Sequence, residues 1–214
     1  MKKHISELAY WQKRFLIENG NLANDHYRKL MLGIAQEKDD SFLAGKIVAD
    51  FGCGPRGSLA WTTTPARRIG IDVLIPAYLD SFGECMLKHG MEYVTSTEKI
   101  IPLPAASVDV LFTINSLDHV DNLGEMVDEL FRIIKPGGLF FASFNLNEPS
   151  SEAEPQCFDE ETLRLHILKR LNIKSYRVAL KNKHDTYKNM YDNKIIKNIP
   201  EKHCILWMSG INKG

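Results

Sequence analysis

The stretch "VADFGCGPRG", in which an apolar run meets a cluster of glycines, constrains the fold of this chain most strongly. Residues 46–52 are predicted to form a buried strand, and Gly52 and Gly54 lie in the turn that follows it. A turn without side chains lets the backbone approach a ligand closely. Because ligands of open parallel sheets bind beyond the carboxyl ends of the strands, this turn predicts a nucleotide-binding site.

Short apolar strands alternate with amphipathic helices from residue 46 onward, which is typical of a parallel sheet with helices on both faces. Strands are expected at 46–52, 67–74, 91–97, 107–116, 138–146, 173–182 and 203–210. Helices are expected at 4–19, 24–36, 78–90, 123–135 and 159–171. Residues 58–66 are interpreted as the start of a helix or as its loop.

Composition excludes several classes of protein. The 27 basic and 27 acidic residues cancel, so bulk charge gives no reason to expect a nucleic-acid or membrane partner. The four cysteines show no paired spacing, which indicates reduced thiols and neither a disulfide framework nor a metal site. The basic start lacks the apolar core of a signal peptide. We therefore expect a soluble, cytoplasmic protein.

Two acids narrow the expected ligand. Asp72 ends the second strand, 18 residues after Gly54, where a carboxylate can accept hydrogen bonds from both ribose hydroxyls. The Gly-Lys-Ser/Thr sequence of a P-loop is absent. Asp50 precedes the first glycine by two residues and favours an adenosine ligand that carries an amino group over a pyrophosphate. The simpler alternative is a tight turn flanked by two strand-end acids.

Four segments together resemble the class I S-adenosylmethionine-dependent methyltransferases of the small-molecule type. They read "VADFGCGPRG", "GIDVL", "EKIIPLPAASVDVLFTINSLDHV" and "LFRIIKPGGLFFASF", in the order and spacing of that family, over residues 46–144. The resemblance implies one Rossmann-like α/β domain with a seven-stranded, mostly parallel sheet whose last strand is antiparallel. It also implies S-adenosylmethionine as cofactor and S-adenosylhomocysteine as product.

The resemblance assigns roles to individual residues. The methionine end of the cofactor would contact Asp50, Gly52 and Gly54; the ribose would meet Asp72; the adenine would lie near Val73, Thr97 and Glu98; and the transferred methyl group would lie near Asn115, Ser116 and Leu117. The family usually has an aspartate where this chain reads "VTSTEKIIP", so a hydroxyl of Ser96 or Thr97 would take its place. Arg56 is interpreted as a solvated residue that could also meet an acidic substrate.

The segment "SLDHVDN" offers a candidate proton acceptor after the fourth strand. The unperturbed pKa of histidine, about 6.5, suits proton removal near neutral pH, so His119 with Asp118 is a candidate general base. The alternative is a histidine that caps the next helix or packs beneath the cofactor.

Residues 1–40 are predicted to form a helical lid over a core of residues 41–214, with an insert at 181–203 on the far rim of the acceptor pocket. The lid's candidate contact residues are Tyr10, Trp11, Arg14, His26 and Tyr27. Arg14 or Tyr27 could hold the cofactor carboxylate, which needs a donor or a cation. For Trp11 the alternative is core packing.

Three functions remain open from the sequence. The leading hypothesis is methyl transfer from S-adenosylmethionine to an oxygen or nitrogen of a small molecule, without a metal. An NAD-dependent oxidoreductase could use the same sheet, but no Tyr-x-x-x-Lys sequence follows the fourth or fifth strand. A methyltransferase-like binding protein without activity is the third alternative. Oligomeric state and the identity of the acceptor do not follow from the sequence.

Overall fold

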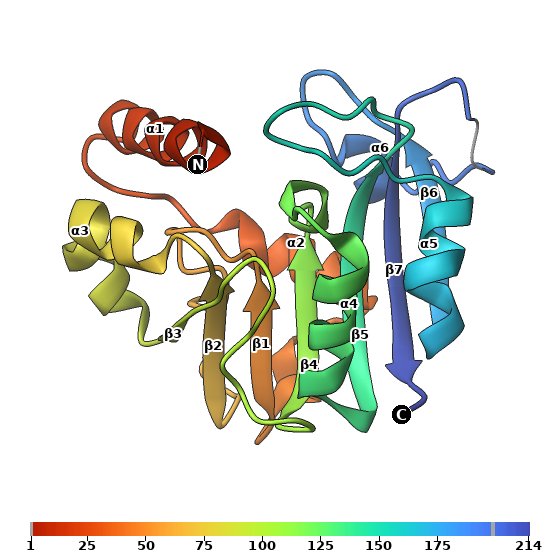
Figure 1. Ribbon diagram of the computed structural model, residues 1–214, viewed down its shortest axis with the longest axis horizontal. Helices are drawn as coiled ribbons and strands as arrows, with labels where there is room; N and C mark the ends of the chain where they lie inside the picture. Colours follow the sequence, from red (N-terminus) through yellow and green to blue (C-terminus); the bar gives the residue numbers. More distant parts are fainter. Residues whose placement is uncertain (1, 198–199) are drawn as a thin grey trace.

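The computed structural model describes residues 2–197 and 200–214, which surround a seven-stranded sheet (Figure 1). The strand order is β3-β2-β1-β4-β5-β7-β6. The bounds are β1 Ile47–Phe51, β2 Arg67–Asp72, β3 Glu92–Thr95, β4 Val108–Ile114, β5 Ile134–Leu146, β6 Leu171–Leu180 and β7 Cys204–Asn212. From β3 to β5 all neighbours are parallel, whereas β7 is antiparallel to both β5 and β6. The predicted sheet with an antiparallel last strand is confirmed.

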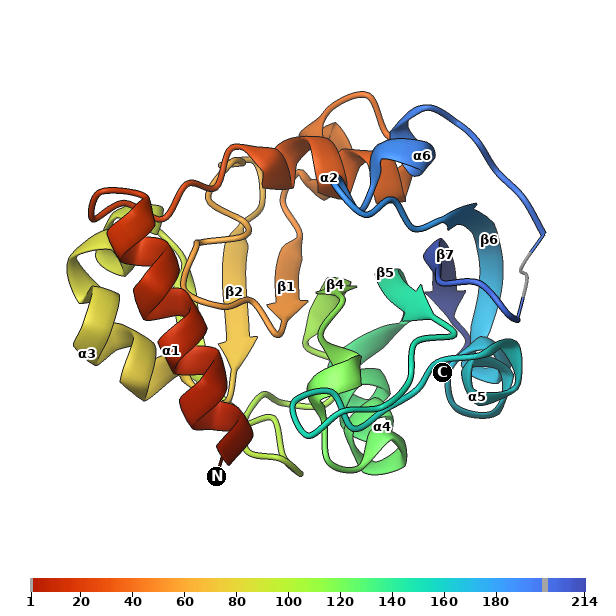
Figure 2. The same ribbon diagram turned by 90° about the horizontal axis from the view of Figure 1, so that it is seen from above.

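Helices cover both faces of the sheet (Figure 2). Their bounds are α1 Lys2–Ile17, α2 His26–Ala35, α3 Ile75–Met86, α4 Leu123–Ile133, α5 Glu160–His166 and α6 Lys188–Tyr191. One face carries α2 and α6, the other carries α4 and α5, and α3 contacts β3 at one edge. None of the described helices has both the length and the apolar character that crossing a membrane requires.

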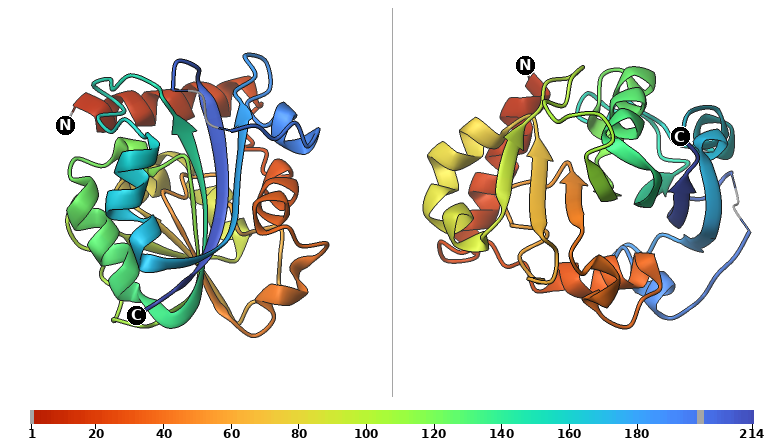
Figure 3. Two further views of the ribbon diagram at one scale, coloured as in Figure 1. Left: turned by 90° about the vertical axis from the view of Figure 1, so that its right-hand side faces the viewer. Right: turned by 90° about the horizontal axis from the view of Figure 1, so that it is seen from below.

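The two N-terminal helices have different places. Only α1 lies across the carboxyl ends of the strands, where a lid was expected (Figures 1 and 3). Helix α2 packs on the sheet through Leu30, Met31 and Ile34, which join the core cluster around Trp207. The spacing of apolar residues is similar in both helices, so sequence periodicity alone does not distinguish a roof from a core layer.

The segment at 181–203, expected as an insert, contributes to the same core layer as α2. Met190 of α6 is buried, and the rings of Tyr187 and Tyr191 contact Trp207 with centroids 5.6 and 5.3 Å away. Two positions of this segment, 198 and 199, lie outside the described residues. Aromatic contacts of this kind join the segment to β7 and explain why it runs beside the sheet.

No helix forms between β1 and β2 in the described chain, so the loop reading of residues 58–66 is the correct one. Polar contacts hold this connection instead. The Asp40 carboxylate accepts hydrogen bonds from the hydroxyls of Thr62 and Thr64 at 2.6 and 2.9 Å. Arg68 donates to the carbonyl oxygens of Thr62 and Gly90 at 2.8 and 2.6 Å. The connection is therefore ordered without regular structure.

The sequence "KPGG" forms a bulge between α4 and the main part of β5. Ile134 pairs with Val108 and Leu139 pairs with Val110, so residues 135–138 protrude from the ladder. The Lys135 ammonium pairs with the Asp109 carboxylate at 2.6 Å across this bulge. A Cβ atom at Gly138 would lie 2.7 Å from Ile134 Cγ2 and 2.9 Å from the Lys135 carbonyl oxygen. Only glycine fits this position without displacing its neighbours.

The variant Gly138→Ala is expected to unfold more easily, by about 1–3 kcal/mol, because the added methyl group overpacks the bulge. Gly83→Ala in α3 is the matched control, since its Cβ would meet no atom within 4 Å. Because alanine has the higher helix propensity, the control should be at least as stable as the parent protein. Urea unfolding of the three proteins measures both effects, and equal stability of the two variants would contradict the steric explanation.

Candidate functional site

Residues at the carboxyl ends of β1, β2 and β4 and on α1 line a cavity. Figures 1 and 3 show α1 lying across these strand ends. The space of the cavity amounts to about 920 Å³, part of it open to solvent. The wall combines residues of α1, the glycine turn after β1, the end of β2, and the segments after β3 and β4.

Gly52 lets the ends of β1 and β4 approach each other. Its backbone has φ +71°, and a Cβ atom there would lie 2.2 Å from Ser116 Cβ. The Ser116 hydroxyl lies 2.8 Å from the Phe51 carbonyl oxygen, to which it donates, and 2.7 Å from the Thr113 hydroxyl. Any larger residue at 52 would separate the two strand ends and enlarge the floor of the cavity.

Asp72 supports the glycine turn from the neighbouring strand. Its carboxylate accepts hydrogen bonds from the backbone amide of Gly54 at 3.1 Å and from that of Leu74 at 2.9 Å. These bonds use one acceptor site on each oxygen, and a carboxylate has about four such sites. Asp72 can therefore accept further hydrogen bonds from a ligand in the cavity.

Asp50 places a second carboxyl group next to the first. It is 3% exposed, and its Oδ1 has no hydrogen-bond partner within the described chain. Burial and, to a smaller extent, the nearby Asp72 raise the pKa of Asp50 to about 7, although the Ser58 hydroxyl lowers it in part. Burial also raises the pKa of Asp72 to about 6, against the two backbone hydrogen bonds that lower it. A positively charged or hydrogen-bond-donating ligand would favour the ionised form of both groups.

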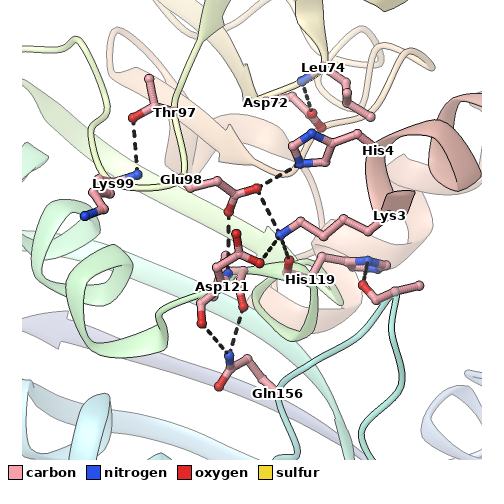
Figure 4. Close-up of polar contacts among 12 residues, drawn as sticks. Lys3, His4, Asp72, Leu74, Thr97, Glu98, Lys99, His119, Asp121 and Gln156 are labelled. Carbon is pink, nitrogen blue, oxygen red and sulfur yellow. Dashed lines mark hydrogen bonds and ion pairs between the residues drawn. The ribbon is translucent and has the colours of Figure 1, made fainter. Parts of the chain in front are cut away.

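The first turn of α1 is attached to the rim of the cavity by charged side chains (Figure 4). Lys3 Nζ lies 2.9 Å from Glu98 Oε1 and 2.6 Å from Asp121 Oδ1, and it donates to the His119 carbonyl oxygen at 2.9 Å. His4 Nε2 lies 2.8 Å from the same Glu98 oxygen. Glu98 thus accepts two contacts from α1, so the roof is held partly by electrostatic attraction.

The other end of α1 rests on an apolar cluster with α3. Leu8, Trp11 and Phe15 pack against a group that includes Tyr78 and Phe82. No residue of α1 is fully buried. The helix is therefore a cover with a thin apolar contact, and its attachment costs less to break than that of a core helix.

Arg56 is buried, with 7% exposure, so its interpretation as a solvated residue is wrong. Its guanidinium donates to the Ala23 carbonyl oxygen and pairs with the Glu18 carboxylate. Arg14 pairs with the same carboxylate at 2.6 Å. The sequence did not reveal this cluster because Ala23 and Glu18 lie 33 and 38 positions before Arg56.

Asn115 joins the end of β4 to β5 and to the segment before α6. It has φ +47°, a left-handed conformation that asparagine adopts more readily than most residues. Its amide nitrogen Nδ2 donates to the Tyr187 hydroxyl at 2.9 Å, and its Oδ1 accepts from the Ser143 hydroxyl at 3.0 Å. Burial raises the pKa of Tyr187, so this phenol stays protonated. The network fixes the Asn115 side chain at the cavity wall.

His119 lies in the wall beyond Asn115, next to two carboxylates. Its Nδ1 is 3.0 Å from the Ala153 carbonyl oxygen, and its Nε2 is 3.8 Å from Asp118 Oδ1 and 3.9 Å from Glu154 Oε1. Burial raises the pKa of Asp118; a charged His119 would lower it, and Glu154 raises it. The ring therefore presents Nε2 to negatively charged neighbours.

The structure brings most of the predicted site residues to one cavity. Its wall includes Gly52, Gly54, Asp72, Val73, Thr97, Glu98, Asn115, Ser116, His119 and Tyr27. The other predicted residues, Asp50, Leu117, Asp118 and Arg14, do not line it. Trp11 lines the wall, whereas Tyr10 and His26, the remaining lid candidates, do not.

Sequence reasoning missed three cavity residues of α1, namely Lys3, His4 and Glu7. Thr97 lines the cavity, and its hydroxyl also accepts hydrogen bonds from the backbone amides of Lys99 and Ile100 at 3.2 and 2.9 Å; its place near the adenine stays a prediction. Nothing in the sequence pointed to these three residues of α1, because a pattern of charges does not reveal that a helix lies across the end of a sheet.

The part of the chain that resembles known proteins contains most of the residues that line the cavity. The family model described as "Methyltransferase domain" matches residues 49–142, which include β1 to β5 and the glycine turn. A probable S-adenosylmethionine-dependent methyltransferase of Mycolicibacterium smegmatis is 31% identical over 104 residues, which are 47% of this chain and 38% of that protein. The malonyl-[acyl-carrier protein] O-methyltransferase of Yersinia pestis is 29% identical over 124 residues, 58% of this chain and 45% of the relative. The chain spans less than half the length of these curated relatives.

Solved structures show the same fold. A Thermotoga maritima S-adenosylmethionine-dependent methyltransferase, described as a possible histamine N-methyltransferase, superposes with a TM-score of 0.61. The alignment covers 100% of both chains at 17% sequence identity. At this identity the likeness concerns the fold alone.

Glu98→Gln is expected to loosen the first turn of α1, because it removes the carboxylate that faces Lys3 and His4. Amide hydrogen exchange in the first two turns should become about three- to tenfold faster, since a hydrogen bond to a charged group contributes about 1.5–3 kcal/mol, part of which glutamine retains. Glu92→Gln, which breaks the exposed pair with Arg67, is the control and should leave α1 unchanged. Equal exchange in both variants would show that apolar packing alone holds the helix.

Proposed function

Because the chain belongs to the class I S-adenosylmethionine-dependent methyltransferases, we propose that it transfers a methyl group to an oxygen or nitrogen of a small molecule. The observation that carries this proposal is the meeting of Gly52, Gly54, Asp72 and Asn115 at one roofed cavity. Open backbone, a carboxylate with free acceptor sites and a polar far wall suit an adenosine ligand that carries an amino acid.

The residues present fit the expected cofactor. The buried, unpartnered Oδ1 of Asp50 and the Asp72 carboxylate favour a ligand with an ammonium group and hydroxyl donors. In the proposed arrangement the methionine end lies at Gly52 and Gly54, and the ribose lies at Asp72. Val73, Ser96 and Glu98 would surround the adenine, and Leu117 would support the wall from behind.

Tyr27 is the better of the two candidates for the cofactor carboxylate. It lines the cavity, and burial raises the pKa of its phenol, so it remains a hydrogen-bond donor. Arg14 already pairs with Glu18 and lies outside the cavity wall. We therefore assign the carboxylate contact to Tyr27.

When bound, S-adenosylmethionine supplies an electrophilic methyl group on sulfur. The chain's own contribution is mainly to hold two reactants in line and to exclude water, which accounts for a large part of the barrier reduction in such reactions. Helix α1 would exclude water as the roof. An oxygen acceptor must also lose a proton, and we propose that His119 and Asp118 serve this step from the cavity's far end.

An oxygen acceptor is supported by the name of one similar protein, the malonyl-[acyl-carrier protein] O-methyltransferase. The acceptor would enter beside Asn115 and Tyr187, between the end of β4 and the loop of residues 147–157. This rim is polar, as the Asn115, Ser143 and Tyr187 network indicates. A small polar acceptor suits such a rim better than a lipid.

Titration with S-adenosylhomocysteine and with NAD tests the proposal. The protein should bind the first ligand and not the second. Asp72→Asn should weaken S-adenosylhomocysteine binding by about tenfold or more, because a buried partner that hydrogen-bonds the ribose hydroxyls contributes about 1–3 kcal/mol. The control is Asp80→Asn on the exposed side of α3, which should bind as the parent protein does. Calorimetry measures both affinities, and preferential binding of NAD would contradict the proposal.

The affinity for S-adenosylhomocysteine should rise with pH between about 5.5 and 8. The pKa values of Asp50 and Asp72 are raised to about 7 and about 6, so both groups are partly protonated at pH 5.5 without ligand. The ligand favours their ionised forms, so binding releases protons and becomes weaker as the pH falls. Calorimetry in buffers of different ionisation enthalpy detects the released protons. In Asp50→Asn the rise should be smaller; an affinity independent of pH in the parent protein would argue against ionised carboxylates in the complex.

A further inference from the structure

We propose that Asp118, His119 and Glu154 form a binding site for a divalent first-row transition-metal ion at the far end of the cavity. Their candidate ligand atoms all lie within 4.8 Å of one another. His119 Nε2 is 3.8 Å from Asp118 Oδ1 and 3.9 Å from Glu154 Oε1. Nitrogen and oxygen ligands at about 2.0–2.2 Å from a metal lie roughly 3–3.5 Å apart, so small side-chain rotations would complete the site.

The His119 ring is oriented as metal-binding histidines usually are. Its Nδ1 lies 3.0 Å from the Ala153 carbonyl oxygen, which can only accept a hydrogen bond. Nδ1 therefore carries the proton, and in the neutral ring Nε2 has a free lone pair. Histidine ligands of metals typically donate the other ring N–H to a carbonyl or carboxylate in this way.

Asp118 supplies an independent indication of a missing partner. The residue is 5% exposed, and its Oδ1 has no hydrogen-bond partner in the part of the chain that the structure describes. This oxygen is the atom that faces His119 Nε2. A buried carboxylate oxygen without a donor is costly, and a bound cation would satisfy it.

The two carboxyl groups of the cluster would also be stabilised by a cation. Within the described part of the chain, Asp118 and Glu154 are each paired with His119 and with no lysine or arginine. Two lysines of other segments are already paired: Lys3 of α1 pairs with Glu98 and Asp121, and Lys181, after β6, pairs with Glu148. Two carboxylates thus face one imidazole that has its proton on the far nitrogen.

The backbone around the three residues is fixed. Gln156 donates through its backbone amide to the Asp118 carbonyl oxygen at 3.1 Å and through Nε2 to the Val120 carbonyl oxygen at 2.9 Å. Figure 4 shows the Gln156 side chain reaching the turn at Asp121. The Glu154 amide donates to the Ser151 hydroxyl at 3.0 Å. The loop of residues 147–157 is therefore attached to the turn that carries Asp118 and His119, which keeps the Glu154 carboxylate near Nε2.

One imidazole and two carboxylates select among metals. Calcium and magnesium prefer oxygen ligands alone, whereas Mn²⁺, Fe²⁺, Co²⁺ and Zn²⁺ accept an imidazole with carboxylates. Of the three residues only His119 lines the cavity, so an ion bound here would lie at the cavity wall, beside the place proposed for the acceptor. With Nε2 bound to the ion, His119 would not accept the proton itself; an acceptor hydroxyl bound to the ion would instead lose its proton more readily to water. This last consequence rests on the proposed methyl transfer, but metal binding itself does not.

The test is Mn²⁺ binding to the full chain after treatment with a chelator and desalting, without S-adenosylmethionine or acceptor. Mn²⁺ is a suitable probe because it does not prefer thiolates, and Cys157 is exposed nearby. Electron paramagnetic resonance of the free ion gives the bound fraction. One Mn²⁺ per chain should bind, and His119→Ala, Asp118→Asn and Glu154→Gln should each weaken it by about tenfold or more.

Glu152→Gln is the matched control, because Glu152 lies in the same loop and is exposed. It should bind Mn²⁺ as the parent protein does. Glu154 is half-exposed, so Glu154→Gln replaces only a surface carboxylate and should fold even if the variant at buried Asp118 does not. No binding, or equal binding by all four variants, overturns the proposal. S-adenosylhomocysteine binding measured in parallel separates a failure of the metal site from a failure of the proposed function.

Discussion

The close contact between Gly52 and Ser116 determines where everything else in the site can lie. It lets β1 and β4 end side by side, and the Ser116 hydroxyl links them through the Phe51 carbonyl oxygen. These two strands are the centre of the sheet, with β2 and β3 on one side and β5, β7 and β6 on the other. The floor of the cavity is therefore built from strands that are hydrogen-bonded on both sides within the sheet, whereas its roof is held by side chains.

The fold followed from the sequence because its signals are local. Apolar runs, the glycine turn and the helix ends each depend on a few neighbouring residues, and the alternation of strands and helices limits the topology. The cavity wall around Gly52, Gly54, Asp72 and Asn115 was found for the same reason. The bulge at residues 135–138 was not predicted: the helix was expected to run to residue 135 and the strand to start at 138, whereas α4 ends at Ile133 and β5 begins at Ile134.

Contacts between distant segments were not predictable. Arg56 was expected in solvent because neither Glu18 nor the Ala23 carbonyl oxygen could be assigned to it from spacing. Likewise, Lys3 and His4 meet Glu98 only because α1 crosses the sheet, and α2 joins the core although its periodicity resembles that of α1. In each case the tertiary arrangement decides which of two locally equivalent roles a residue takes.

The turn of residues 118–121 is held from two sides. Lys3 of the roof reaches the His119 carbonyl oxygen and Asp121, while Gln156 of the loop after β5 reaches the carbonyl oxygens of Asp118, Val120 and Asp121. Helix α1 and the loop of residues 147–157 are thus attached to the same short turn. Displacement of either one would break contacts of residues 118–121, so a movement of the roof would also weaken the attachment of the loop on the other side of the turn.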